Sequence, residues 1–361
     1  MSKKIIYPAV PVITHLILTA AGIILLSSYV NAQNSTTLIE GYIYDGATEK
    51  MVSGANVYLS ETTWIVESDA EGYFRFADLS PGRYQLIISH PGYEIYKREV
   101  EFEAKEEIFL EQILKPLQNE QKIIVESEQN REWRRNFRRF EEFFIGESEN
   151  GKETEILNPE VLSFKADRTS FSAKANQDLL IRNGSLGYEI VMDLTHFEWY
   201  ENSGSASIHY FSFFKELNPN THEELHIWQT NREQTYRYSP DRFFKSLIDG
   251  NLCENDYKLI GGEIENVTES RQDDFRVFNE SGTISKFNIS LEYGNIKLEV
   301  EIDDDKIGYI GFNETGEDRI YEMYIDQNGL ILNPMDFFLD GIWEHYKIAD
   351  KLPLNYIYKE K

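Results

Sequence analysis

Short runs in which apolar residues dominate or alternate with polar ones follow one another through residues 38–116. The runs that can form strands lie at 57–59, 73–76, 84–89, 100–102 and 108–114. Clusters of glycine, proline and aspartate separate them, at residues 54, 69–72, 81–82 and 91–92. Short strands at a spacing of about 8–12 residues, divided by such turn residues, are typical of an all-β sandwich. The pattern therefore predicts a seven-stranded β-sandwich at residues 38–116.

A second set of strand patterns occupies residues 151–361. Candidate strands lie at 186–199, 275–278, 283–293, 296–302, 307–312 and 320–325, and helical patterns lie at 221–236 and 240–252. The runs 287–293 and 296–302 alternate strictly and are separated by Gly294-Asn295, a common hairpin turn pair. We therefore expect these two runs to form a hairpin with one buried face. The fold class predicted for the chain is mainly β, with a β-rich α+β domain containing a few helices after the sandwich.

Residues 117–150 between these regions are interpreted as a linker and an amphipathic helix. Aromatic residues recur at helical spacing within 131–144, and five arginines lie between them. One interpretation is an interfacial helix that contacts a membrane surface through Trp133, Phe137, Phe140 and Phe144. The other is a domain-joining helix whose aromatic stripe packs into the next domain. We favour the joining helix, because an acidic chain offers many partners for the arginines.

The first 32 residues have the composition of an export signal. Lys3 and Lys4 form a basic start, residues 5–26 are mostly apolar, and Ala32 ends a small-x-small sequence of the kind that signal peptidase reads. The apolar run is about 20 residues long, so a retained membrane anchor is the alternative. Because Pro8 and Pro11 interrupt its first half, we expect residues 1–32 to be a cleaved signal peptide.

Charge and cysteine content exclude several classes of protein. The chain carries 36 basic and 62 acidic residues, a formal net charge of −26. A surface this acidic repels a phosphate backbone, so we expect no nucleic-acid partner. Cys253 is the only cysteine, which excludes an intramolecular disulfide and a lipid anchor directly after the signal. Its acidic surroundings favour a half-buried structural residue over a nucleophile.

The turn residues of the first region carry a resemblance to a known family. In order they read Gly41-x-Ile43-x-Asp45, Gly54-Ala55-x-Val57, Asp69-x-x-Gly72-x-Phe74, Leu79-x-Pro81-Gly82-x-Tyr84 and Gly92-Tyr93. This order resembles the carboxypeptidase regulatory-like domain, a transthyretin-like sandwich. In that family the module accompanies metallocarboxypeptidases, precedes many outer-membrane receptors and opens many envelope proteins. The resemblance implies a fold and no catalytic residues, because activity resides in sites and not in folds.

Segments beyond the sandwich resemble exported envelope proteins of Gram-negative bacteria. They are Trp133-x3-Phe137-x2-Phe140-x3-Phe144, Asn158-Pro159, Asn183-x2-Leu186-Gly187-Tyr188, Trp228-x2-Asn231-Arg232, Ser239-x2-Arg242-Phe243-Phe244 and the closing Trp343-x3-Lys347-Ile348-Ala349-Asp350-x-Leu352-Pro353-x-Asn355-Tyr356. No activity or catalytic residue can be carried over from that family. One departure is Lys347, which replaces the family's usual arginine and cannot form a bidentate pair with a carboxylate.

Only one segment matches an enzyme motif. The string His222-Glu223-x-x-His226 would place two imidazoles one turn apart on a helix to hold zinc, with Glu223 as general base. Residues 218–221 place this string at a helix start, where Thr221 and Glu224 would form a capping box and the histidines would be exposed. A third ligand is also needed, and Glu233 and Glu254 downstream lie in no recognisable motif. Zinc-dependent hydrolysis is therefore the alternative hypothesis.

Other chemistry lacks residues in the expected pattern. None of the seven histidines has Glu three positions later, as a metallocarboxypeptidase requires, and no nucleophile elbow or phosphate-binding loop occurs. Two acidic clusters, residues 303–305 and 326–329, could bind calcium but do not continue into a complete binding loop, so we interpret them as turns. The chain is also too short for a receptor with a plug and a large barrel.

We therefore expect an exported binding or structural accessory protein of the cell envelope, located in the periplasm or at the outer membrane. It would have no catalytic site and no cofactor of its own. The partner would be an envelope protein or a glycan. The chain is more readily interpreted as a non-enzyme than as an enzyme, and the zinc hydrolase is kept as the alternative.

Overall fold

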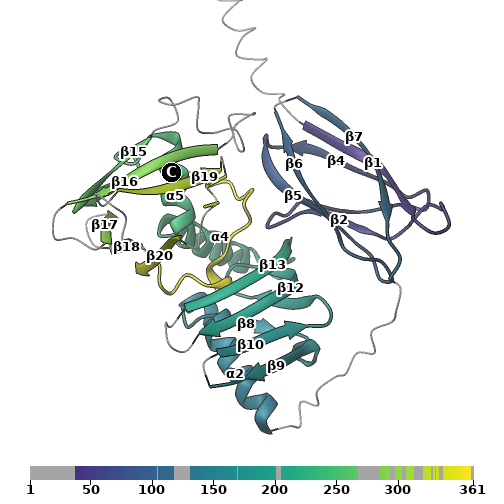
Figure 1. The fold of residues 1–361 in the computed structure, drawn as a ribbon, viewed down its shortest axis with the longest axis horizontal. Helices are drawn as coiled ribbons and strands as arrows, with labels where there is room; N and C mark the ends of the chain where they lie inside the picture. The colour runs from purple at the N-terminus through teal and green to yellow at the C-terminus, as the bar shows by residue number, and fades with distance from the viewer. Residues whose placement is uncertain are drawn as a thin grey trace, which may run out of the picture.

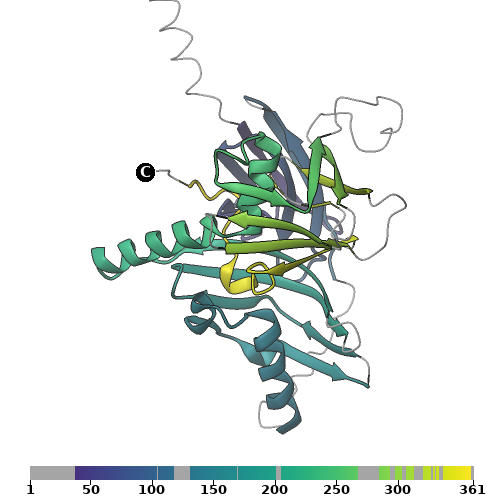
Figure 2. The same ribbon diagram turned by 90° about the vertical axis from the view of Figure 1, so that its left-hand side faces the viewer.

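The computed structural model describes residues 37–103, 105–117, 131–168, 170–200, 205–266, 284–292, 297–302, 306–312, 320–326, 328–329, 331–332 and 336–358. The expected signal peptide, the candidate strand 275–278 and the aspartates 303–305 lie outside these ranges. Figures 1 and 2 show three parts along the chain: a purple and blue sandwich, a teal sheet with its helices, and a green and yellow β region. No helix among the described residues is long and apolar enough to cross a membrane.

The N-terminal part is the predicted seven-stranded sandwich. Its strands form two sheets, ordered β4-β1-β7 and β3-β2-β5-β6. Their bounds are β1 Thr37–Asp45, β2 Asn56–Leu59, β3 Ile65–Glu67, β4 Tyr73–Leu79, β5 Gly82–Ser89, β6 Tyr96–Phe102 and β7 Glu107–Leu114. Buried and half-buried residues alternate along β1, so one face of this strand lies in the core between the sheets. Gly41 lets β1 and β7 pair in parallel, because a side chain there would overlap the carbonyl of Leu110.

The next part is a six-stranded antiparallel sheet covered by a helix. The strands are β8 Thr154–Ile156, β9 Leu162–Ala166, β10 Ser170–Ala175, β11 Leu179–Asn183, β12 Tyr188–Tyr200 and β13 Ser205–Glu216. The helix α2 (Arg131–Phe144) packs its aromatic stripe against this sheet, and the short α3 (Glu149–Lys152) follows it. Trp133, Phe140 and Phe144 are buried and Phe137 is half-buried in the same core. The prediction that the aromatic stripe packs into the next domain is confirmed, and the alternative membrane contact through these four residues is wrong, because the core buries three of them and half-buries Phe137.

The last part has two small sheets around a separate core. One sheet has the order β14-β17-β18-β20 and the other β15-β16-β19. Their bounds are β14 Tyr257–Ile260, β15 Gly262–Asn266, β16 Ile284–Leu291, β17 Lys297–Ile302, β18 Lys306–Phe312, β19 Ile320–Asp326 and β20 Phe337–Gly341. The helix α5 (Pro240–Asp249) packs against this core, and α4 (His222–Arg237) connects it to the six-stranded sheet. Both helices match the predicted segments.

The expected hairpin between residues 287–293 and 296–302 is wrong. Each run forms a strand with one buried face, as its alternation predicts. However, β16 pairs with β15 and β19, whereas β17 pairs with β14 and β18. The two strands face the same core from different sheets. Alternation reports which face of a strand is buried, and it does not report which strand lies beside it.

The sandwich is docked against the six-stranded sheet through its β3-β2-β5-β6 side. A small buried cluster joins Tyr58 and Ile87 of the sandwich to Val191 and Phe213 of β12 and β13. The turn after β2 also pairs with the outer edge of β13: the amide of Glu61 donates to the carbonyl of Ser212 at 2.6 Å, and Phe214 donates to Thr62 at 2.9 Å. This docking brings the loop between β4 and β5 close to α4, α5 and the C-terminal segment.

Candidate functional site: a pocket where three parts of the chain meet

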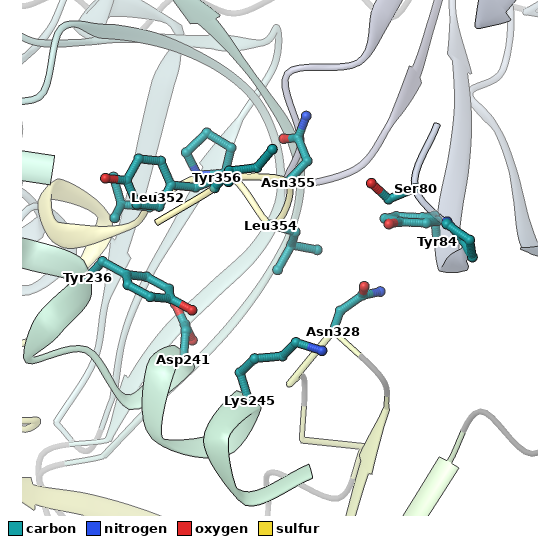
Figure 3. Close-up of a pocket in the computed structure, with 13 residues that line it drawn as sticks. Ser80, Tyr84, Tyr236, Asp241, Lys245, Asn328, Leu352, Leu354, Asn355 and Tyr356 are labelled. Carbon is teal, nitrogen blue, oxygen red and sulfur yellow. The ribbon is translucent and has the colours of Figure 1, made fainter. Parts of the chain in front are cut away.

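A pocket of ≈ 320 Å³ lies where the sandwich, the two helices and the C-terminal tail meet; we call it the junction pocket. Its lining residues come from four segments of the chain and are Ser80, Pro81, Tyr84, Tyr236, Asp241, Lys245, Asn328, Leu352, Pro353, Leu354, Asn355, Tyr356 and Ile357. Figure 3 shows Tyr84 and Ser80 on one side, Tyr236, Asp241 and Lys245 on the other, and Leu354 between them. The volume is at the lower end of the range for small-molecule sites.

The C-terminal tail forms one wall of the pocket because it is fastened to the sandwich. The amide of Leu354 donates to the carbonyl of Glu61 at 2.8 Å. The side-chain amide of Asn355 bonds Thr63 twice: its Oδ1 accepts from the Thr63 amide at 3.0 Å, and its Nδ2 donates to the Thr63 hydroxyl at 2.8 Å. Upstream, Leu352 is buried in the core of the six-stranded sheet. The tail thus spans the two parts and holds the wall in place.

The opposite wall depends on the tight elbow between α4 and α5. Ser239 caps α5, since its hydroxyl accepts from the amide of Arg242 at 3.0 Å, and Pro240 occupies the first helical position. The indole of Trp343 donates to the carbonyl of Tyr238 at 3.1 Å and so fixes the elbow against the last part of the chain. These contacts place Tyr236 at the end of α4 and Asp241 at the start of α5 on the same side of the pocket.

A cluster of charged and phenolic groups lies beneath the pocket. Asp241 accepts a hydrogen bond of 2.6 Å from the Tyr346 hydroxyl. Burial alone would lower the pKa of the Lys351 ammonium, but Asp241, Tyr210 and Glu61 together raise it. Burial, followed by the charge of Asp241, raises the pKa of Tyr346 well above its usual value. Asp241 is therefore charge-compensated and hydrogen-bonded, which suits a structural carboxylate better than a catalytic base.

Phenol hydroxyls supply most of the free hydrogen-bonding capacity of the pocket. Burial raises the pKa of both Tyr84 and Tyr236, so both hydroxyls stay protonated at neutral pH. Within the described residues, neither hydroxyl has a hydrogen-bond partner, and the same is true of Ser80. Figure 3 shows the oxygens of Tyr84 and Tyr236 directed from opposite walls toward the space between them. Lys245 is already paired with Asp249 at 3.3 Å.

The zinc-binding string lies away from this pocket, at the exposed start of α4. His222, Glu223 and His226 are all exposed. Thr221 caps the helix as expected, since its hydroxyl accepts from the Glu224 amide at 3.0 Å. Glu224 itself accepts from the Asn220 side chain at 3.1 Å and from the Asn220 backbone amide, one residue before the cap. The helix start is therefore capped through Thr221 and Glu224, and Glu223 lies in the first turn, where the helix dipole favours an acidic side chain.

The structure supplies no third zinc ligand among the residues that it describes. In those ranges, no three His, Cys, Asp or Glu side chains lie close enough together to hold a metal ion. Glu254 is exposed, and so is Cys253, which corrects the expectation that this cysteine is half-buried. Asp326 accepts from the amide of Asn328 at 2.9 Å, in a turn that fits the predicted solvated loop only in part, because Asp326 itself is buried. The zinc alternative stays a prediction.

The motif residues beyond the sandwich have structural partners in this fold. Arg232 donates to the carbonyls of Leu186 and Gly187 and to Glu216, and its guanidinium lies 3.9 Å from the centre of the Tyr188 ring. Lys347 packs its stem against Gly146, and burial lowers its pKa. These contacts give both residues a role in packing the six-stranded sheet region.

Sequence reasoning missed most of the pocket. It singled out Asn355 and Tyr356 as motif residues without assigning a position to them, and it named neither Tyr84 nor Tyr236 as a site residue. It also missed Lys351, which lies between two motif residues. The adjacent charged residues Asp350 and Lys351, directly before the apolar residues 352–354, were a signal available in the sequence.

In comparisons with known proteins, a family model matches the first part of the chain. Residues 39–125 match the family model described as CarboxypepD_reg-like domain. Among curated proteins, no significant match was found. Similar solved structures include a chain of a type II cohesin–X-dockerin complex from Acetivibrio cellulolyticus, at 22% identity, covering 22% of this chain and 56% of that one with a TM-score of 0.20. Hydroxyquinol 1,2-dioxygenase from Pseudomonas putida matches at 11% identity, with coverages of 24% and 58% and a TM-score of 0.20.

A minor pilin from Streptococcus agalactiae matches at 20% identity over 24% of this chain and 47% of that one, with a TM-score of 0.21. The chain thus spans about half the length of the solved proteins it matches. The turn motifs, the two-sheet topology and the family match agree on one assignment. The N-terminal sandwich of this protein is a CarboxypepD_reg-like domain.

Proposed function

We propose that this protein is an exported cell-envelope accessory protein that binds a short saccharide in the junction pocket and catalyses no reaction of its own. The observation that carries the proposal is the pocket lining, which combines tyrosine rings with free hydroxyls. We place it in the periplasm or at the outer membrane because of the predicted signal peptide. Sandwich domains of this kind also begin many envelope proteins that the chain resembles.

The chemistry of the lining favours a sugar over a charged metabolite. Sugar rings have an apolar face that packs on aromatic rings, and hydroxyls that exchange hydrogen bonds with phenols and amides. Tyr236 and Tyr356 lie with ring centres 5.6 Å apart, and Tyr84 faces them across the pocket. The two charged groups in the lining, Asp241 and Lys245, already have partners. A neutral ligand with many hydroxyls therefore matches the groups that are left.

The pocket also lacks the parts of a hydrolase. Its lining contains no histidine or cysteine, and Asp241 is held by Tyr346 and compensated by Lys351. Two carboxylates flanking a bound sugar would be needed for glycoside hydrolysis. The lining offers one, which supports binding without turnover.

The test is a binding screen with a blocked pocket. Purified full chain is titrated with defined envelope oligosaccharides, and heat release and thermal unfolding are recorded. Leu354→Trp fills the space between the two walls and is expected to abolish binding while leaving the fold intact. Leu157→Trp makes the same change at an exposed leucine of the six-stranded sheet region and should bind as the parent does. Equal binding by both variants, or no saccharide binding by the parent, overturns the proposal.

The zinc hydrolase remains the second candidate because of His222, Glu223 and His226. It predicts one equivalent of zinc in protein purified without chelators, and peptide hydrolysis that disappears in Glu223→Gln. Metal analysis by mass spectrometry decides the first point. Protein with less than about one-tenth of an equivalent of zinc and no hydrolysis removes this candidate.

A further inference from the structure

The outer face of the β4-β1-β7 sheet carries an exposed row of aromatic and apolar residues. Tyr42 lies in the middle of this row, with ring centres 5.3 Å from Tyr73 and 6.1 Å from Phe109. Phe109 is 56% exposed and Ile113 is 61% exposed, the largest values for β-strand apolar residues in the sandwich. The sandwich docks through its other sheet, so this face is turned away from the rest of the described chain (Figure 1).

The strand β7 is also an open edge of that sheet. It pairs with β1 on one side only. At its two ends, the carbonyls of Glu106 and Leu114 accept hydrogen bonds from β1 and the turn after it, so the even-numbered residues direct their backbone groups toward β1. The odd-numbered ones therefore direct theirs outward. In the described ranges, no hydrogen bond reaches the backbone of Glu107, Phe109 or Glu111.

The side chains along this edge form a charge pattern. The same odd-numbered positions, which face outward from the sheet, read Glu107, Phe109, Glu111 and Ile113. Acidic and apolar side chains thus alternate in steps of two residues along one face. A strand added beside β7 would place its own side chains opposite these, where unlike charges and apolar pairs are favourable. Lys105 and Lys115 stand just beyond the two ends and leave the centre of the edge acidic.

We propose that β7 is a docking edge for an extended segment of a partner protein in which basic and apolar residues alternate. The segment adds as a fourth strand to the β4-β1-β7 sheet. Backbone hydrogen bonds to the outward groups of β7 supply affinity, and the alternating side chains supply register. Its basic residues pair with Glu107 and Glu111, and its apolar residues extend the row of Phe109, Tyr42 and Tyr73.

Charge argues against a second copy of this chain at the same edge. Pairing of β7 with its own copy would bring Glu107 and Glu111 of both molecules into one short ladder, and each molecule has a formal net charge of −26. Like charges in neighbouring strands are destabilising. By contrast β13, which pairs with β12 at one side of the six-stranded sheet, is paired at Ser212–Phe214 with the chain's own turn at residues 60–63. In the described sandwich, β7 thus combines an edge without a neighbouring strand with Phe109 and Ile113, its most exposed apolar strand residues.

The experiment uses the full chain and two synthetic eight-residue peptides, one alternating lysine with valine and the other alternating glutamate with valine. Fluorescence anisotropy at low and moderate salt should show binding of the lysine peptide only, weakened by salt. In the double variant Glu107→Lys and Glu111→Lys the preference should reverse, with the lysine peptide bound about tenfold more weakly or worse. Glu71→Lys, an exposed glutamate in a turn of the same sandwich, should change the affinity less than about twofold.

A backbone variant separates strand addition from simple charge attraction. In Phe109→Pro the lost amide is one that points outward, so pairing with β1 survives and only the added strand is blocked. Phe109→Ala removes the ring and keeps the amide; it should bind measurably, whereas Phe109→Pro should not. Circular dichroism and the thermal midpoint confirm that both variants fold. Three outcomes overturn the proposal: equal binding of the two peptides, full binding by Phe109→Pro, or concentration-dependent dimerisation of the parent that Phe109→Pro abolishes.

Discussion

The two sheets of the sandwich present apolar outer faces to different surroundings. The outer residues Tyr58 and Ile87 of β2 and β5 are buried against Val191 and Phe213. Those of β1 and β7, such as Tyr42 and Phe109, lie beside one another and beside Tyr73 of the same sheet, and Phe109 remains exposed. Both faces contain large apolar side chains, so composition does not distinguish them.

The residue patterns of β5 and β7 differ in a way that matches the surroundings of the two faces. Residues 86–88 of β5 are a continuous apolar run, which is what a strand covered on both sides requires. In β7, glutamates interrupt the outer positions every four residues, as they do in strands whose edge must not pair indiscriminately. The difference indicates one permanent interface and one surface kept for a selective partner.

The largest expected effect is at the docked face. Ile87→Ala should lower the free energy of unfolding by about 3 kcal/mol, because it removes a fully buried side chain and leaves a cavity between two parts of the chain. Ile113→Ala, the same change on the free face, should cost no more than about 0.5 kcal/mol. Urea denaturation followed by circular dichroism measures both. Equal losses at the two positions would show that the free face is covered too.

Removing the lysine of the charged cluster beneath the pocket should lower the free energy of unfolding nearly as much. Lys351→Met removes the cation whose charge interacts with those of Asp241 and Glu61, and we expect the free energy of unfolding to fall by about 2–3 kcal/mol, since an uncompensated carboxylate in a partly buried cluster is costly. Lys174→Met, at an exposed position of β10, is the matched control and should be nearly neutral. Differential scanning calorimetry compares the two. A neutral Lys351→Met variant would mean that water, and not the lysine, compensates these carboxylates.

The smallest expected effect is a gain in stability. It concerns the pH dependence of unfolding, which two carboxylates near the docked face influence. Burial raises the pKa of Asp178, and burial followed by the charge of Asp178 raises that of Asp193, which Lys97 partly offsets. These two carboxylates lie opposite each other, in register with the β11–β12 pairing, on the face that meets Tyr58. Because both pKa values are raised on folding, the folded state binds more protons. Stability therefore falls as pH rises from about 4 through the raised values.

Asp178→Asn should remove part of that slope and stabilise the protein slightly at neutral pH, with no gain below about pH 4, where the wild-type carboxyl is already protonated. The measurement is the thermal midpoint between pH 4 and 8. Glu71→Gln, on an exposed turn, is the control and should leave the slope unchanged. A steeper slope in Asp178→Asn would contradict the sign of the raised pKa.

Much of the fold could be predicted from local sequence patterns. The sandwich and five of its seven strands, the helix at residues 131–144 and the helices α4 and α5 follow from turn residues, periodicity and caps. The failures involve relations between distant segments. The alternation of β16 and β17 predicted their buried faces and not their partners, because register and pairing depend on which sheet each strand joins.

Less of the candidate site could be predicted from the sequence. The string at His222 was visible as a motif, yet its environment is an exposed helix start. The junction pocket was invisible, because Tyr84 and Tyr236 are separated by more than 150 positions in the chain and are brought together only when the sandwich docks. No window of sequence contains both walls.

The local elements of this protein are encoded in short stretches of its sequence: the turn chemistry of the CarboxypepD_reg-like sandwich and the buried stripe of α2. Those depend on backbone preferences and on periodicities of two and 3.6 residues, which act over a few positions. Which sandwich face is covered, which edge stays open and where the pocket forms depend on the assembled fold. These features depend on contacts between segments far apart in the chain, and such contacts leave no periodic mark in either segment.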